Sequence, residues 1–307
     1  MRNVFFRQLI HLETVDIGHT RIRIPVAAIH GKATGPTLLV TAGIDGDEYA
    51  GIEAAYRLIH EFSEKPFLGK LIIIPIVNVP GFIAETSQNP LDGLFPKYIY
   101  PGKKDGKPTQ RLCWYIHNLA EKSDYWLDMH GGALTEIIEP FIGSWVSGNS
   151  RVDSMTQKII QSLDSKFAVF ENNPAVTKTA LLAKRGCGYL LTESGESGGI
   201  EEKAVTQHIC WAHQTMSALG MLTEKVHIFP KTIMTRLDEY VIHRDGIWKA
   251  ARRHCEELKT GAIIGEVLSL NGRSLETITA KEEGKLLWVK VGYSARRGDV
   301  VAGVGIN

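Results

Sequence analysis

This sequence has little cysteine, little net charge and no long apolar run. Only four of its 307 residues are cysteines, and they are scattered: Cys113, Cys187, Cys210 and Cys255. Such spacing is typical of reduced thiols rather than of a disulfide framework or a thiolate zinc site. The formal charge of +1 argues against an electrostatically driven nucleic-acid partner. No apolar stretch reaches the ~20 residues of a membrane-spanning helix, so we expect no membrane partner.

The remaining composition is that of an ordinary globular protein, with 44% hydrophobic and 22% charged residues. A chain of this length forms one large domain or one domain with an appendage. The first residues lack a signal-peptide pattern, because Arg7 and His11 interrupt the apolar stretch. We therefore expect a cytoplasmic location.

Strand-like and helix-like patterns alternate over the first two-thirds of the chain. Such alternation predicts an α/β fold with a mostly parallel sheet flanked by helices. The predicted strands are 21–29, 38–42, 71–77, 125–129, 138–146 and 167–170. The predicted helices are 48–62, 109–122, 150–163 and 200–222.

After about Thr223 the pattern changes to short alternating runs separated by glycines, which predicts a small β module. We therefore expect a catalytic domain over residues 1–223 and a β-rich appendage over 224–307. Between a predicted strand and a predicted helix, residues 79–108 form a long segment rich in Pro, Gly and Lys. A loop of this length is either a substrate-binding loop or a flexible surface insertion.

Acid and imidazole side chains follow three apolar runs that are typical of strands. Asp45 and Glu48 come after the run at 38–42, His130 directly follows the run at 125–129, and Glu193 directly follows the run at 189–192. Ligands bind outside the carboxyl ends of the strands in open α/β sheets, so these residues predict a metal site at one sheet edge.

Each of these candidate ligands could instead have a purely structural role. Asp-Gly is a common turn, and acids are favoured at helix N-termini, so Asp45 and Glu48 could simply shape the junction. His130 could be a hydrogen-bonded core histidine, and Glu193 could fix the following Gly-rich loop. Asp128 shares the face of His130 and could orient its ring.

An ordered series of motifs supports the chemical interpretation. Gly43-Ile-Asp-Gly-Asp-Glu-Tyr-Ala-Gly51, Pro75-Ile-Val-Asn78, Tyr100-Pro-Gly102, Asp128-Met-His-Gly-Gly132 and Thr192-Glu-Ser-Gly195 together resemble the succinylglutamate desuccinylase/aspartoacylase family. That family belongs to the zinc carboxypeptidase superfamily. The resemblance implies a carboxypeptidase-like α/β domain, a β domain beside the active site, and hydrolysis of an N-acyl amide. It assigns metal binding to Asp45, Glu48 and His130, and general acid/base catalysis to Glu193.

The first metal position departs from the family pattern, which is His-x-x-Glu. Aspartate at position 45 adds a negative charge, so two carboxylates and a neutral imidazole formally cancel a divalent charge. We expect a weaker Lewis acid and a less acidic bound water than in efficient zinc hydrolases. Zinc remains the expected metal, and the oxygen-rich ligand set makes manganese the alternative.

The long loop also departs from the family pattern, in which an Arg and then an Asn-Arg pair clamp a substrate carboxylate. Here Ser87 aligns with the first Arg, and Lys97-Tyr98 align with the Asn-Arg pair. Lysine does not supply the planar bidentate fork of arginine. Lys97, Tyr98 and Arg111 are the expected substrate-binding residues. Asn78 either contacts substrate or pins the start of the loop.

These observations predict a metal-dependent deacylase acting on a small N-acyl amino acid or amine. We do not expect a preference for N-acetylaspartate or succinylglutamate, because the arginines are missing. A carboxypeptidase-like peptidase and a degenerate, non-catalytic binding member of the family are the alternatives. The oligomeric state is left open.

Overall fold

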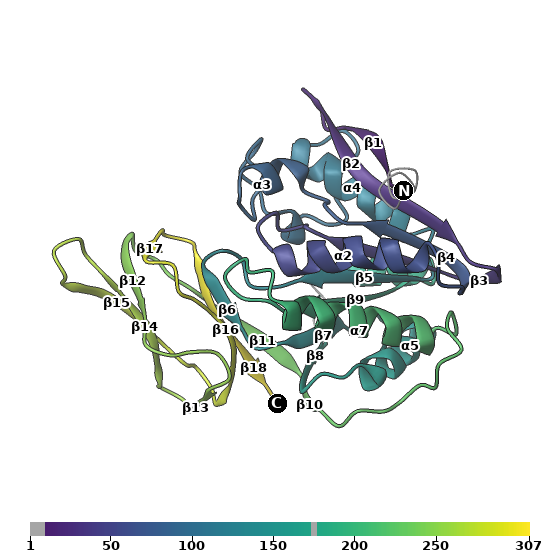
Figure 1. Cartoon of the computed structure of the whole chain (residues 1–307). Coiled ribbons are helices and arrows are strands. Elements are labelled where there is room, and N and C mark those ends of the chain that lie inside the picture. The colour runs from purple at the N-terminus through teal and green to yellow at the C-terminus, as the bar shows by residue number, and fades with distance from the viewer. Residues whose placement is uncertain (1–9, 173–176) are drawn as a thin grey trace.

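The computed structural model describes residues 10–172 and 177–307, which form two lobes (Figure 1). The larger lobe contains a nine-stranded sheet with the order β1-β2-β4-β3-β5-β9-β7-β8-β10. In chain order its strands are β1 (Ile10–Asp16), β2 (Arg21–His30), β3 (Ala33–Ala42), β4 (Leu68–Ile74), β5 (Tyr125–His130), β7 (Phe141–Trp145), β8 (Phe167–Glu171), β9 (Gly188–Glu193) and β10 (Thr232–Met234). The four central strands, β4, β3, β5 and β9, are parallel. The predicted α/β class with a mixed, mostly parallel sheet is confirmed.

Helices cover both faces of this sheet. Those of the described residues are α2 (Tyr49–Phe62), α3 (Val79–Ile83), the 3-10 helix η1 (Pro96–Tyr98), α4 (Pro108–Ala120), α5 (Ser150–Ser162), α6 (Thr177–Lys184) and α7 (Glu202–Ala218). None of these helices has the length and apolar character needed to cross a membrane.

The central strands are buried on both faces, and alternate residues feed two separate cores. Leu38 and Val40 pack with helices α2, α5 and α7, whereas Leu39 between them packs with α4 and α6. Strand β5 follows the same period of two, with Leu127 in the first core and Trp126 in the second. This double burial explains the continuous apolar runs in the sequence and fixes the register of each strand.

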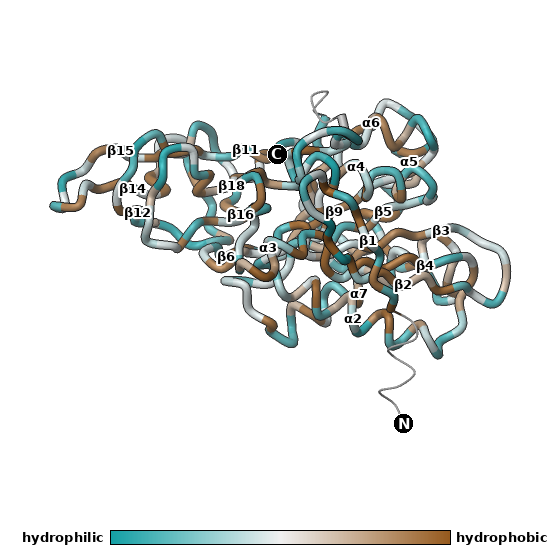
Figure 2. Tube along the Cα trace, turned by 90° about the horizontal axis from the view of Figure 1, so that it is seen from above, coloured by the Kyte–Doolittle hydropathy of each residue, from teal (hydrophilic) through white to brown (hydrophobic). Residues whose placement is uncertain are grey.

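The smaller lobe is made of antiparallel β-sheets. Its strands are β11 (Arg236–Val241), β12 (Gly246–Ala250), β13 (Glu257–Leu258), β14 (Ile263–Leu268), β15 (Ser274–Thr279), β16 (Gly284–Lys290), β17 (Ser294–Ala295) and β18 (Val300–Ile306). One sheet has the order β11-β18-β16-β13 and the other β15-β14-β12-β17. Seen from above, this lobe projects sideways from the larger one, with β15 at its far end (Figure 2).

Each lobe donates a strand to the other. The short strand β6 (Glu136–Ile138) comes from the first part of the chain and pairs with β16 of the smaller lobe. Strand β10 lies beyond the predicted boundary at residue 223 and still pairs with β8 of the large sheet. The sequence pattern predicted one strand over 138–146. The structure instead separates β6 from β7 around Pro140, where the chain moves from one sheet to the other.

The long loop has a structure of its own. Helix α3, the helix η1 and a bridge between Asn89 and Leu94 divide it into short pieces. The side chain of Asn78 accepts a hydrogen bond from Gly81 N and donates to the carbonyls of Ser87 and Gln88. The amide of Asn78 therefore pins the start of the loop, which is the second of the two roles considered for it.

Truncation of a side chain in strand β5 tests how far the fold depends on this central strand. Leu127 is fully buried, and Leu127→Ala is expected to lower the free energy of unfolding by about 2–5 kcal/mol. Leu270 is 89% exposed, so Leu270→Ala is the matched control, with an expected change within about 0.5 kcal/mol. Chemical denaturation of both variants measures the difference, and equal stabilities would contradict this packing.

A candidate metal centre at the carboxyl ends of the parallel strands

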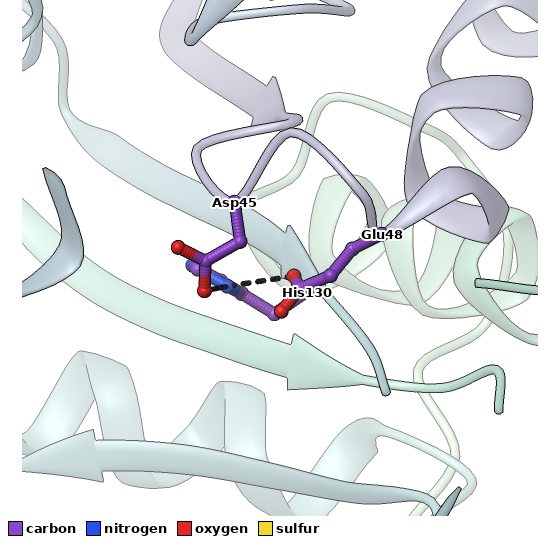
Figure 3. A group of neighbouring side chains, drawn as sticks. All are labelled: Asp45, Glu48 and His130. Atoms are coloured by element: carbon purple, nitrogen blue, oxygen red, sulfur yellow. Dashed lines mark hydrogen bonds and ion pairs between the residues drawn. The ribbon is translucent and has the colours of Figure 1, made fainter. Parts of the chain in front are cut away.

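Three predicted ligands converge at one edge of the large sheet. Asp45 lies in the turn after β3, Glu48 immediately precedes α2, and His130 is the last residue of β5. Because β3 and β5 are parallel neighbours, their carboxyl ends lie side by side. Figure 3 shows the three side chains pointing toward one another. All three are buried, and one ligand atom from each lies within 4.8 Å of the others.

The turn that carries Asp45 packs tightly against the long loop. A Cβ atom at Gly46 would lie 2.2 Å from Phe82 N, so only glycine permits this close approach. The Asp-Gly pair is therefore part of a close contact as well as a turn.

Hydrogen bonds orient the imidazole of His130. Its Nδ1 lies 3.0 Å from Glu48 Oε2 and 3.7 Å from Asp45 Oδ2, so this nitrogen faces the two acids. On the other side, Nε2 lies 3.3 Å from Asp128 Oδ2. Asp128 is itself held by Thr41 Oγ1, at 2.6 Å, and by Tyr189 Oη, at 2.9 Å. This arrangement allows Nε2 to carry the proton and leaves Nδ1 as a ligand atom.

The carboxylate of Asp45 lacks the hydrogen bonds that a buried charge requires. It is completely buried, yet neither of its oxygens has a hydrogen-bond partner among the described residues. Lys97 Nζ forms an ion pair with Oδ2 at 2.7 Å, outside hydrogen-bond geometry. A buried carboxylate in this state is costly, because one ion pair replaces only part of its hydration.

The electrostatics show a local excess of negative charge. Burial and the neighbouring Asp45 raise the pKa of Glu48 well above its usual range. Although burial opposes the charged form of His130, Asp128 and Glu48 raise the pKa of its imidazole. Burial likewise opposes charge on Lys97, but attraction by Asp45 raises the pKa of its ammonium group. Three buried carboxylates, at positions 45, 48 and 128, thus surround one imidazole. Their negative charge favours the protonated forms of neighbouring groups.

This donor set fits a divalent cation. Two carboxylates and an imidazole are ligands of catalytic zinc, and they leave room for a water or substrate atom in a fourth position. The unbonded oxygens of Asp45 are the strongest structural sign, because a metal would satisfy them and would offset the carboxylate charge.

Glu193 lies beside this centre without belonging to the ligand triad. It ends β9, and the sheet register pairs it with His130. Burial raises the pKa of its carboxyl group to about 8. A carboxyl group with a pKa near neutrality, beside a metal centre, suits proton transfer in both directions.

The centre opens into a cavity of about 1090 Å³. Glu48, His130 and Glu193 line its base, and the long loop contributes Lys97 and Tyr98. Residues of the smaller lobe complete the wall, among them Arg236, Lys281 and Lys290. Tyr98 Oη bonds to Glu239 across the two lobes at 3.3 Å. Both lobes therefore shape the space above the candidate ligands.

The structure does not bring Arg111 to this cavity. Its guanidinium donates to Gly106 O at 2.8 Å and lies 3.6 Å from Asp16, next to a separate surface depression. The guanidinium also lies against Gly18, in the turn between β1 and β2. Neither Arg111 nor Asn78, which caps the loop, lines the cavity formed by the described residues, and a substrate-binding role for either stays a prediction.

Sequence reasoning missed several polar residues of the cavity, among them Lys178 and Glu136. Helix α6 was not predicted, so Lys178 was not placed. Glu136 lies on the strand that crosses to the smaller lobe, a pairing without a local sequence signal. Tyr100 also lines the cavity, and only its place in the Tyr-Pro-Gly motif pointed to it.

The fold and the site define a class: an α/β protein with a candidate metal centre at the carboxyl ends of parallel strands and a β lobe beside it. A sequence profile of the succinylglutamate desuccinylase/aspartoacylase catalytic domain matches residues 34–218. The chain belongs to this family, as the motifs predicted.

Individual relatives agree with this assignment. The Nα-acetyl-L-2,4-diaminobutyric acid deacetylase of Halomonas elongata is 30% identical over 180 residues, which cover 58% of this chain and 52% of that protein. The matched region thus spans about half of the relative. The product-bound ectoine utilization protein of Ruegeria pomeroyi has the same fold, with a TM-score of 0.83 and 21% identity over 97% of this chain and 95% of that one. A Rhodobacter sphaeroides member of the family gives a TM-score of 0.81 at 21% identity, with the same coverage.

A buried histidine that supports the end of β9 gives a pH-dependent prediction. His208 contacts Thr192 Oγ1 and Ser194 O, and burial lowers the pKa of its imidazole to about 4. The unfolded chain takes up this proton near pH 6.5 and the folded chain does not, so stability falls as the pH drops from about 6.5 to 4. The loss attributable to His208 is up to about 3 kcal/mol. His208→Gln should remove this part of the pH dependence of unfolding, and an unchanged pH profile would contradict it.

Proposed function

We propose that this protein is a metal-dependent deacylase that hydrolyses the amide bond of a small N-acyl amino compound. The observation that carries the proposal is the buried Asp45 carboxylate, which accepts no hydrogen bond among the described residues and has a ligand atom within 4.8 Å of those of Glu48 and His130. Family membership supports the reaction class, since the matched profile describes a catalytic domain of deacylating enzymes. Zinc is the proposed metal and manganese the alternative, because of the aspartate at position 45.

A divalent cation held by Asp45, Glu48 and His130 would supply Lewis acidity for the acyl carbonyl and would make a water molecule easier to ionise. Glu193 takes the proton of the attacking water and then delivers it to the nitrogen of the leaving amine. Asp128 keeps the proton of His130 on Nε2 and so keeps the ring in its ligand orientation. Lys97 offsets the extra negative charge that Asp45 brings in place of histidine.

The relatives support the choice of substrate class. The name of the Halomonas elongata protein gives it an acetylated diamino acid as its substrate. A cavity of about 1090 Å³ accommodates a molecule of that size with space to spare. We therefore propose an N-acyl amino acid or amine, rather than a large peptide.

Replacement of the proposed proton carrier separates catalysis from metal binding. Glu193→Gln keeps the size and polarity of the side chain but cannot accept a proton. We expect full metal content and a kcat lower by about 10²–10⁴-fold. Elemental analysis and hydrolysis assays on a panel of N-acyl amino acids measure both quantities. Loss of the metal in this variant would assign Glu193 to the ligand set instead.

A pair of neighbouring aspartates tests the ligand assignment. Asp45→Asn removes a ligand charge, and we expect zinc affinity to fall by at least about tenfold, since even residues outside the ligand set carry effects of 10–100-fold. Asp47→Asn is the matched control, because Asp47 instead accepts hydrogen bonds from Ser87 Oγ and Leu134 N. Competition titration with a chelating dye gives both affinities. Equal affinities of the two variants would contradict the assignment.

A further inference from the structure

A lysine ammonium group lies in an aromatic cage at one side of the cavity. Lys178 Nζ, from helix α6, lies 3.8 Å from the ring centre of Tyr189, 5.0 Å from that of Tyr100 and 5.1 Å from that of Trp126. The side chain lines the same cavity as Glu48, His130 and Glu193. The cage therefore places a cation within the space proposed for the substrate.

Among the described residues, no carboxylate lies within ion-pair distance of this cation, although the charge of Asp128 attracts it. Lys178 is only 9% exposed, and none of the described acidic residues forms an ion pair with it. Contacts with aromatic faces stabilise an ammonium group by electrostatic attraction to the ring. They do not satisfy its three N–H donors, and a buried charge needs such partners. The cage thus holds a cation in place while leaving its hydrogen-bonding capacity for another group.

A second polar group of the cage also lacks a partner. The hydroxyl of Tyr100 is buried and makes no hydrogen bond to the described residues. Burial raises the pKa of this phenol well above its usual range, so the hydroxyl keeps its proton and remains a donor. Buried polar groups are nearly always hydrogen-bonded, and an exception calls for a ligand or a water to satisfy it. An ammonium group and a phenol together suit an anion.

The cage connects directly to the candidate metal centre. Tyr189 donates its hydroxyl to Asp128 Oδ2, and Asp128 contacts His130 Nε2. Asp128 has three such partners already, counting Thr41, and forms no ion pair with Lys178, although the two charges attract each other through space. Lys97, which the long loop contributes to the cavity, is paired with Asp45. Ser87, which stands at a position of the missing arginines, is bonded to Asp47.

We propose that Lys178 and Tyr100 bind the carboxylate of an N-acyl amino acid. They do so in place of the bidentate arginines that the long loop lacks. The proposal rests on the proposed deacylase function for its choice of ligand. It predicts that the substrate is an amino acid derivative with a free carboxylate, rather than an N-acyl amine without one.

Binding measurements test the subsite without relying on turnover. The Glu193→Gln protein, loaded with zinc, is titrated by calorimetry with a panel of N-acetyl-L-amino acids, among them Nα-acetyl-L-2,4-diaminobutyrate, and with the matching carboxamides. We expect at least one acid to bind more tightly than its amide. Lys178→Met in the same background should weaken binding of that acid by about 10–100-fold, the effect of losing one charged hydrogen bond, and leave the amide unchanged.

Two further variants sharpen the result. Lys104 also lies over an aromatic ring, 5.9 Å from the centre of Trp114, but does not line the cavity, so Lys104→Met is the matched control. Tyr100→Phe removes only the hydroxyl and should weaken binding of the acid by a smaller factor. Methionine fits an aromatic cage, so the melting temperature of Lys178→Met should be retained.

Several results would overturn the subsite. They are the absence of any preference for acid over amide, an equal effect of Lys104→Met, and a loss of amide binding that matches the loss of acid binding. Turnover by the unmodified protein tests the deacylase function separately. Acid binding that depends on Lys178, in a protein that hydrolyses none of the panel, would leave the subsite standing and refute the deacylase.

Discussion

Negative charge is concentrated at the carboxyl ends of β3 and β5. The rest of the site is arranged around the need to offset this charge. Asp45, Glu48 and Asp128 are buried within reach of a single imidazole, and folding has to remove three carboxylates from water. Such a cluster is unfavourable unless positive charge enters it. His130 and Lys97 supply part of that charge. The unbonded oxygens of Asp45 identify where a cation would supply the remainder.

The parallel order of the central strands makes this concentration possible. It brings the ends of β3, β5 and β9 to one edge, although the residues concerned lie far apart in sequence. Double burial of those strands fixes their register, so each functional side chain has a defined place. The exchange of β6 and β10 between the lobes holds the smaller lobe beside this edge. The cavity wall opposite the ligands thus comes from strands of the smaller lobe.

Many of the strands and helices, and the position of His130, could be predicted from the sequence, because the patterns that indicate them lie within short segments. The apolar runs of β3, β4 and β5 and the helical period of α2 gave the elements within a few residues. The position of His130 at a strand end, followed by two glycines, gave its place at the sheet edge. Strand exchange had no local signal, since β6 is three residues long and its partner lies some 150 residues later. Arg111 was assigned by proximity in sequence, and the direction of its side chain depends on how α4 packs. Lys178 was missed because its importance lies in the rings around it, which come from three separate segments.

The charge of Lys97 offsets the negative charge that Asp45 brings to the candidate metal centre. A histidine ligand would bring no charge, whereas Asp45 brings one and Lys97 lies 2.7 Å from it. The neighbouring Tyr98 is the residue that aligns with an arginine of the family's loop, so Lys97 is the cation closest to that position in the sequence. This use of Lys97 leaves carboxylate recognition to another cation, and Lys178 is placed for that task.

Anomalous diffraction at the zinc absorption edge, from crystals grown with zinc, would show whether Asp45, Glu48 and His130 bind a metal ion. We expect a single strong peak between Asp45, Glu48 and His130 Nδ1, with an oxygen of Asp45 in coordinating contact. Density without a peak there, in crystals whose Asp45 remains paired only with Lys97, would contradict it.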